Sequence, residues 1–364
     1  MRFAWSTLSL YFGKRFLQAV LGMFFAVFAL VYMLDFVELL RRAGDARSAA
    51  TGTLAKLALY RTPSVTEQII PFAVLFGSMA AFLNLSRRLE LVVARAAGIS
   101  AWQFLLPAFF SAIAIGFVTM MAYNPLAAGL KREADRLESR VFMRSGGVGT
   151  SEQGVWFRQR SLDGEAIIRA ETVIEKGGAL STVTAFVFDL EGRQIERIES
   201  PAADLKEGYW HFMNAWVLPI GSEPQTFETY LLATSLTQSQ LSESFTPTET
   251  VSFWELKGLV EQLELAGLNS SRYRLRYESL SARPLLFLAM VLLAATVSLR
   301  FFRFGGVARL MLTGVIAGFM LYVATAISND LGTAGVLSTR AAAWSPAALA
   351  SLFGFWALLK LEDG

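Results

Sequence analysis

The sequence predicts a polytopic α-helical membrane protein with six transmembrane helices and an inserted β-jelly-roll domain. Of its 364 residues, 54% are hydrophobic and only 17% are charged, whereas soluble domains contain about 25% charged residues. Six stretches lack any charge and come close to, or exceed, the roughly 20 residues that cross a bilayer as a helix. Between the third and fourth stretches the pattern changes to short runs of alternating hydrophobic and polar residues, which is typical of β-strands.

The charge-free stretches predict three spans before the β-domain and three after it. They are Phe16–Leu34, Gln68–Leu85, Ile99–Leu130, Pro284–Leu299, Leu310–Asn329 and Ala341–Leu359. The first is too long, and is followed by too many others, to be only a cleaved signal peptide. We therefore expect three spans in residues 1–143, the β-domain in residues 144–250, and an amphipathic helix followed by three spans in residues 251–364.

The expected β-domain contains strand-like runs joined by turns. In "TVTAFVFDLEGRQIERIES" hydrophobic residues alternate on both sides of the turn "EGR", and "AADLKEGYWHFMNAWVLP" repeats this arrangement around "KEG". Several such strands at close spacing suggest a small antiparallel sandwich or jelly roll. About a hundred residues are enough for such a domain to bury its own core.

A short charged segment, "RRLELVVARAAGIS", separates the second and third spans, and we expect a helix at residues 86–98. At helical spacing it has one apolar stripe. The stripe consists of Leu89, Val92, Val93 and Ala96. The other side carries Arg87, Leu91 and Arg95, with Glu90 at the border. Taken alone, this pattern also fits an ordinary solvated loop on the cytoplasmic side.

The composition excludes several kinds of chemistry. The chain has no cysteine and a single histidine, His211, which excludes disulfides, cysteine-based metal sites, cysteine nucleophiles and a serine–histidine triad of ordinary robustness. His211 lies in a strand-like run, where an ordinary packed or surface histidine is expected. The sequence contains no GxxxxGK[ST] phosphate loop. Any work driven by ATP therefore has to be powered by another chain.

Basic residues flank the spans on both sides, so counting them does not settle which ends face the cytoplasm. Two explanations fit the basic residues at the outer ends. They can pair with neighbouring carboxylates and contact lipid head groups. Alternatively, they can bind an anionic lipid, whose phosphates accept strong hydrogen bonds from arginine.

Four segments together resemble the lipopolysaccharide-export permease family, and its G-type subunit more than its F-type paralogue. They are "DFVELLRRAGD" after the first span, "SRRLELVVARAAGIS" after the second, "SEQGVWFRQ" at the start of the β-domain and "RYRLRYESLSARPL" before the fourth span. The resemblance covers nearly the whole chain in the same order of spans and β-domain. Its most specific part is the "ELV-x-x-x-A-x-G" pattern at Glu90–Gly98.

The resemblance implies a non-catalytic permease subunit of an ABC transporter in the inner membrane of Gram-negative bacteria. Its implied partners are an F-type permease, a cytoplasmic ATPase homodimer, a single-span periplasmic adaptor of the export bridge and lipopolysaccharide; nucleic acid is not expected. The chain itself would bind no cofactor, because ATP and magnesium are used by the ATPase. The termini and residues 86–100 would be cytoplasmic and the β-domain periplasmic.

The resemblance also implies roles for particular residues. Glu90 would enter a groove on the ATPase and transmit its closing, and Arg87, Leu91 and Arg95 would lie on the same contact surface. Arg41 and Arg42 match a basic pair that meets the lipid A phosphates.

Five further residues have a weaker resemblance or alternative roles. Arg61 is a weaker phosphate candidate, and Arg272, Arg274 and Arg276 could complete a basic ring or simply anchor the fourth span. Asp35 stands where some relatives have lysine, so it is expected to form an ion pair, with Arg41 or with the partner permease, or to cap the membrane edge.

The expected mechanism begins at a lateral gate between the first and fifth spans. Arginine side chains would hold the lipid head group while an apolar wall accepts the acyl chains. Candidates to line an acyl-chain path inside the β-domain are Phe186, Phe188, Trp210 and Trp216, which could equally form its dry core. The alternative functions are a membrane-anchored periplasmic sensor or lipid-binding signalling protein, and a membrane enzyme.

Overall fold

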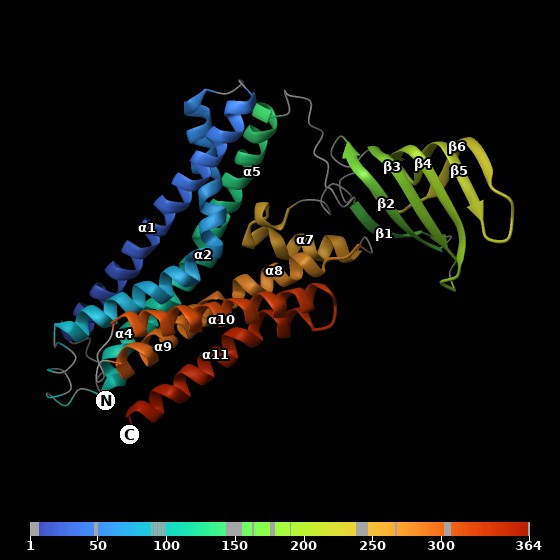
Figure 1. Ribbon diagram of the computed structural model, residues 1–364. Coiled ribbons are helices and arrows are strands. Elements are labelled where there is room, and N and C mark those ends of the chain that lie inside the picture. Colours follow the sequence, from blue (N-terminus) through green and yellow to red (C-terminus); the bar gives the residue numbers. More distant parts are fainter. Residues whose placement is uncertain are drawn as a thin grey trace. The chain divides into compact units, whose positions relative to one another are not determined.

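A computed structural model describes residues 7–46, 50–88, 90, 93, 96, 98, 100–142, 155–161, 164–174, 179–189, 191–237, 247–265, 268–301 and 307–362. They form two compact units, which are described separately (Figure 1). The first unit takes in the described residues up to Leu137, Ser252–Trp254 and those from Arg274 onward; the second takes in those of Glu138–Val251 and Glu255–Tyr273.

The first unit is helical and contains the expected spans. Its helices are α1 (Thr7–Ala46), α2 (Thr51–Arg87), α4 (Ala101–Val118), most of α5 (Asn124–Phe142), most of α8 (Ser271–Ser281), α9 (Arg283–Phe301), α10 (Val307–Thr333) and α11 (Thr339–Glu362). A π-helical turn, Thr119–Tyr123, joins α4 and α5 into one long helix. Within the described ranges, five helices are long and apolar enough to cross a membrane, and α8 with α9 makes a sixth span bent by 50°. The predicted polytopic class is confirmed.

The bend between α8 and α9 has a local cause. Pro284 has no backbone N–H, and its ring opposes the carbonyl group one turn earlier, so it kinks or breaks a helix. Helix α4 packs closely against α9 at Pro284. A Cβ added to Gly116 of α4 would come within 2.4 Å of the Cα of Pro284, so α4 and α9 cross where only a glycine fits.

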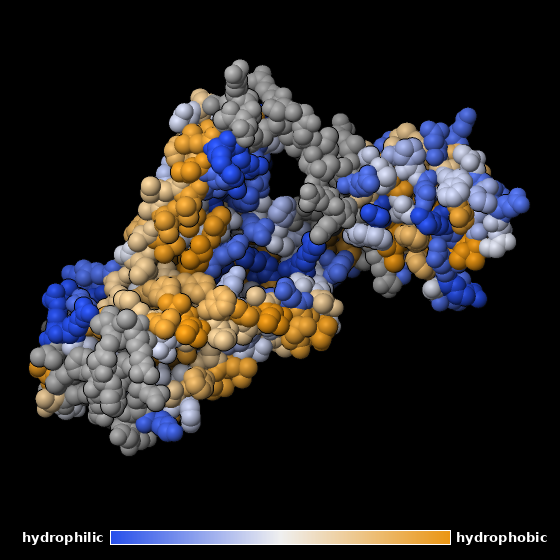
Figure 2. Space-filling model, viewed as in Figure 1, coloured by the Kyte–Doolittle hydropathy of each residue, from blue (hydrophilic) through white to orange (hydrophobic). Residues whose placement is uncertain are grey.

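The core of this unit surrounds α9. Buried side chains from α1, α2 and α4, including Phe16, Leu75 and Leu105, pack in one cluster with nearly every residue of α9 between Phe287 and Ala295. A helix that is apolar on all sides is expected at the centre of a bundle. By contrast, α1, α10 and α11 expose many large hydrophobic side chains, and hydrophobic residues cover much of the visible face of the helical unit (Figure 2). This surface suits contact with lipid or with another membrane subunit.

The second unit contains an antiparallel sheet of six strands. The strands are β1 (Val155–Ser161), β2 (Gly164–Ile174), β3 (Ala179–Phe188), β4 (Gln194–Lys206), β5 (Tyr209–Pro219) and β6 (Gln225–Ala233). Each strand pairs with the next one in sequence, as Figure 1 shows. The predicted β-domain is confirmed. However, the described strands follow the order of a meander, and the Greek-key order of a jelly roll is not seen among them, because short connections such as Glu207–Gly208 keep sequential strands adjacent.

A transverse crease interrupts the pairing at the same level on five neighbouring strands, β2 to β6. The register of the strand pairs skips Glu171, Thr182, Pro201, Asn214 and Glu228, and Thr182 and Asn214 have positive φ angles of 50° and 51°. On β3, β4 and β5, two residues lie between successive buried residues at the crease, whereas a single residue lies between the buried residues on either side of it. The register is the same on both sides of the crease, so no strand gains a residue over its partner there; the break in the alternation re-aims the side chains that follow it. The crease thus keeps the hydrophobic residues of both halves on one face.

The unit also contains helix α7 (Phe253–Leu265), whose first two residues, Phe253 and Trp254, belong to the helical unit. The units divide the chain near the expected boundaries at residues 144 and 250, but Glu255–Tyr273 groups with the sheet and not with the spans.

Candidate functional site

The charged segment after α2 is partly described. Arg87 is the last residue of α2 and is exposed, and Glu90, Val93 and Ala96 are helical. Val93 and Ala96, two members of the apolar stripe, are exposed. The predicted contact residues Leu91 and Arg95 lie outside the described residues. Gly98 has a φ of +82°, a conformation that favours glycine and commonly ends a helix, and Ser100 then caps α4.

Glu90 is connected to α1. The hydroxyl group of Tyr11 donates a hydrogen bond to Oε1 of Glu90 at 3.2 Å. Arg15, one turn further along α1, donates from Nε to the Tyr11 oxygen at 3.3 Å and lies over the Tyr11 ring at 5.4 Å. A displacement of Glu90 would therefore act directly on the first turns of α1.

The predicted lipid-binding arginines lie at the opposite end of α1 and on α2. Arg41 is highly exposed and forms two hydrogen bonds of 3.1 Å with Glu38, one turn earlier. Arg42 is exposed as well. Arg61 lies 3.5 Å from Asp35 in an ion pair that is mostly buried. Asp35 thus pairs with Arg61 of α2, while Asp35 and Arg41, six positions apart on α1, do not face each other.

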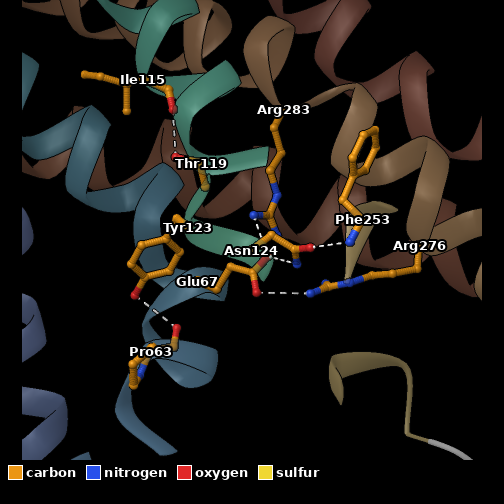
Figure 3. A network of polar contacts seen from close by, with 9 residues as sticks. All are labelled: Pro63, Glu67, Ile115, Thr119, Tyr123, Asn124, Phe253, Arg276 and Arg283. Carbon is orange, nitrogen blue, oxygen red and sulfur yellow. Dashed lines mark hydrogen bonds and ion pairs between the residues drawn. The ribbon is translucent and has the colours of Figure 1, made fainter. Parts of the chain in front are cut away.

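A buried ionic cluster lies between α2, α5, α8 and α9, and Figure 3 shows its members converging on Glu67. Glu67 of α2 is 2% exposed. Its Oε1 lies 2.6 Å from Nη1 of Arg283, and its Oε2 lies 3.3 Å from Nη2 of Arg276. Nδ2 of Asn124, which is fully buried, donates a hydrogen bond of 2.8 Å to Oε1. A buried carboxylate is stable only when it is paired and hydrogen-bonded in this way.

The π-helical turn positions two of these contacts. One extra residue in a helical turn rotates everything that follows it, and such turns occur frequently at functional sites. Immediately after this turn, Asn124 faces Glu67, and the Tyr123 hydroxyl donates a hydrogen bond of 3.0 Å to the carbonyl oxygen of Pro63 in α2 (Figure 3). The turn thereby directs two consecutive side chains onto α2.

Helix α8 is held by three consecutive residues that contact three different helices. Arg276 pairs with Glu67 of α2. The Tyr277 ring stacks on the ring of Phe253, the first residue of α7, with centroids 5.1 Å apart and an interplanar angle of 8°. Glu278 accepts hydrogen bonds from the side chains of Arg340 (3.1 Å) and Trp344 (3.0 Å) of α11. The orientation of α8 is therefore fixed from three sides.

This cluster was not predicted from the sequence. Arg276 was expected either to belong to a basic ring with Arg272 and Arg274, which are exposed, or to anchor the fourth span, and Glu67 was not singled out. A signal was present. Glu67 directly precedes one charge-free stretch, and Arg283 directly precedes another. Opposite charges at the ends of two spans are expected to pair when those spans are neighbours.

The aromatic candidates of the β-domain do not share one face. Trp210 is fully buried, and its Nε1 donates a hydrogen bond of 2.8 Å to the buried side chain of Gln159. Trp216 is 42% exposed on the opposite face. Phe186 is half-buried and is stacked on the exposed ring of Trp156; Phe188 is half-buried as well. A single path lined by all four side chains would have to pass through the sheet.

Comparisons with known proteins agree with this architecture. The chain matches the profile of the lipopolysaccharide export system permease LptF/LptG over residues 10–360. It is 24% identical to the lipopolysaccharide export system permease protein LptG of Escherichia coli strain K12 over 358 residues, which cover 96% of this chain and 97% of that protein. The LptG protein of Escherichia coli O6:H1 matches to the same extent. With its membrane helices and inserted sheet, the chain belongs to the LptF/LptG family of lipopolysaccharide export permeases.

Proposed function

We propose that this chain is the G-type permease subunit of an ABC transporter that extracts lipopolysaccharide from the periplasmic leaflet of the bacterial inner membrane. It pairs with an F-type permease, and a homodimeric cytoplasmic ATPase drives both. The observation that carries the proposal is the contact between Glu90 and Tyr11. It links a charged segment between two spans to the long helix α1, in a chain whose sequence has no phosphate loop. A pulling force applied to Glu90 would therefore reach α1.

The surface of α1 is suited to accept a lipid. Extraction moves several acyl chains out of the bilayer, and each CH₂ group that loses its apolar surroundings costs about 0.8 kcal/mol. Helix α1 exposes large hydrophobic side chains along its length, among them Phe25, Leu30 and Met33, and carries Arg41 and Arg42 at one end. The hydrophobic side chains would contact the acyl chains, while the arginines hold the phosphates.

The final step passes the lipid to the β-domain and from there to a single-span adaptor of the periplasmic bridge. This requires the termini and Glu90 to face the cytoplasm and the β-domain to face the periplasm. The buried face of the sheet, on which Trp210 lies, is the apolar surface that would receive the acyl chains.

Copurification in mild detergent and a charge reversal test the proposal. We expect the chain to bring down a soluble ATPase and a second permease. Glu90→Arg should abolish growth that depends on the protein and lower lipid-stimulated ATP hydrolysis by about tenfold or more, equivalent to about 1.4 kcal/mol. Glu223→Arg, at an exposed carboxylate in the turn after β5, is the matched control and should change neither. An unaffected Glu90→Arg variant, or a chain that binds no ATPase, would contradict the proposal and favour a sensor.

A further inference from the structure

Two of the three candidate phosphate-binding arginines, Arg41 and Arg61, already hold a carboxylate. Nη2 of Arg61 in α2 lies 3.5 Å from Oδ1 of Asp35 in α1. Arg41 donates from Nε and Nη2 to the two carboxylate oxygens of Glu38, each at 3.1 Å. A planar guanidinium group binds a phosphate through the same pair of donors. A phosphate that binds Arg41 in this way must therefore displace Glu38.

The two carboxylates lie next to each other on α1. Asp35 and Glu38 are three positions apart, a spacing that places side chains on the same face of a helix. Like charges at this spacing repel each other, and the paired arginines offset the repulsion. Together, the two carboxylates and the two guanidinium groups carry no net charge. An incoming phosphate would meet both negative charges at once, so it has to compete with them for the arginines.

The two ion pairs differ in how strongly they compete. The side chains of Arg61 and Asp35 are only 24% and 15% exposed, whereas those of Arg41 and Glu38 are 77% and 49% exposed. Water and salt screen an exposed ion pair far more than a partly buried one. Asp35 should therefore be the stronger competitor of a phosphate, and Glu38 the weaker one.

We propose that Asp35 and Glu38 set the affinity of this chain for its lipid by competing with the lipid phosphates for Arg61 and Arg41. The proposal rests on the function proposed above. A transporter must release its lipid as well as bind it, and differences in affinity at one site lie mostly in the rate of dissociation. Arginines without a nearby carboxylate would hold the phosphates and release them slowly. With the carboxylates present, loading exchanges one anion for another, and the returning carboxylate helps the phosphate to leave.

The test uses the whole transporter in liposomes with increasing amounts of lipopolysaccharide. Three quantities are measured: the lipid density that half-saturates photo-crosslinking to a probe at the exposed α1 position Leu30, release of lipid to the soluble bridge protein, and ATP hydrolysis, which reports an assembled complex. Asp35→Asn keeps the size of the side chain and removes its charge. We expect it to lower the half-saturating density about tenfold, equivalent to about 1.4 kcal/mol, and to slow release to a similar extent. Glu38→Gln should lower the density about threefold, because exposed ion pairs contribute little.

Arg61→Gln separates competition from a purely structural ion pair. If Asp35 competes with the lipid, Asp35→Asn tightens loading while Arg61→Gln weakens it about tenfold. If the pair only braced α1 against α2, both variants would weaken loading, and this result would overturn the proposal. Lipopolysaccharide without its lipid A phosphates should bind the Asp35→Asn variant and the natural protein equally. A gain in affinity that persists with this lipid would also overturn the proposal.

Two controls complete the test. Glu191→Gln removes a carboxylate that lies 3.3 Å from the exposed Arg193 in the turn between β3 and β4, and it should leave all three quantities unchanged. Because the Glu38 side chain is about half exposed, Glu38→Gln tests the proposal even if Asp35→Asn does not fold. Unchanged half-saturating densities in Asp35→Asn and Glu38→Gln would refute the competition. Absent crosslinking or hydrolysis in the natural complex would instead contradict the proposed function.

Discussion

The charge of Glu67 should contribute substantially to the stability of the helical unit, and a pair of substitutions can isolate that contribution. Glu67→Gln keeps the shape of the side chain and one of its two hydrogen-bond acceptors, but it removes the negative charge that faces Arg276 and Arg283. The cluster carries one negative and two positive charges, a net charge of +1. The single variant raises this net charge to +2 in a site that is almost completely buried.

The expected loss follows from the geometry. At an effective dielectric constant of about 20, unit charges about 4 Å apart attract each other by about 4 kcal/mol. The charged atoms here are at most 3.3 Å apart. Removing one partner of a buried pair typically costs about 3–5 kcal/mol, because the other charge remains buried without compensation. We therefore expect Glu67→Gln to lower the free energy of unfolding by about 3–5 kcal/mol.

The double variant Glu67→Gln/Arg283→Gln should recover much of this loss. It restores the net charge of +1 and allows the two amides to hydrogen-bond, since replacing a buried pair entirely is often close to neutral. Denaturant unfolding in mild detergent gives the four free energies of the cycle, and we expect a coupling energy of about 2–3 kcal/mol. The exposed substitution Glu261→Gln in α7 is the control and should stay within about 0.5 kcal/mol. Strictly additive losses in the double variant would refute the argument that charge pairing stabilises this cluster.

Two other substitutions test the packing of each unit. Gly116→Ala should destabilise the helical unit by about 1–3 kcal/mol in the same unfolding assay, because its Cβ would meet the backbone of Pro284; Gly22→Ala, which meets open space, should not, and equal effects of both would show that the helices separate easily. Gln159→Leu should destabilise the β-unit by about 1–3 kcal/mol, because it leaves the buried indole N–H of Trp210 without its acceptor, and an unchanged unfolding midpoint monitored by tryptophan fluorescence would contradict this.

The spans and the β-domain could be predicted from the sequence because both depend on local patterns. A charge-free stretch such as Leu310–Asn329 fits a membrane helix whatever surrounds it. The alternation on both sides of "EGR" likewise identifies β3 and β4 as strands. Strand order is different, because the alternation is the same in a meander and in a Greek key. Only the pairing of each strand with the next one distinguishes them.

The candidate sites could be predicted only where a motif marks them. The segment around Glu90 was found through its resemblance to a family, but its contact with Tyr11 joins residues that are 79 positions apart in the sequence. The pair of Glu67 and Arg276 spans 209 positions. No periodicity in a single sequence encodes such contacts. They depend on how the helices pack and on the extra residue in the π-helical turn, which decides where Asn124 points.

The crease in the β-sheet makes the length of each strand as important as its composition. In the part of β5 that follows Asn214, the face on which a side chain lies depends on its distance along the strand from Asn214, where the alternation breaks. Without the crease, regular alternation along β5 would turn Val217 towards water and Trp216 towards the interior, although no hydrophobic residue had been replaced. At the crease, the β-domain should therefore tolerate substitutions far better than insertions or deletions of a single residue.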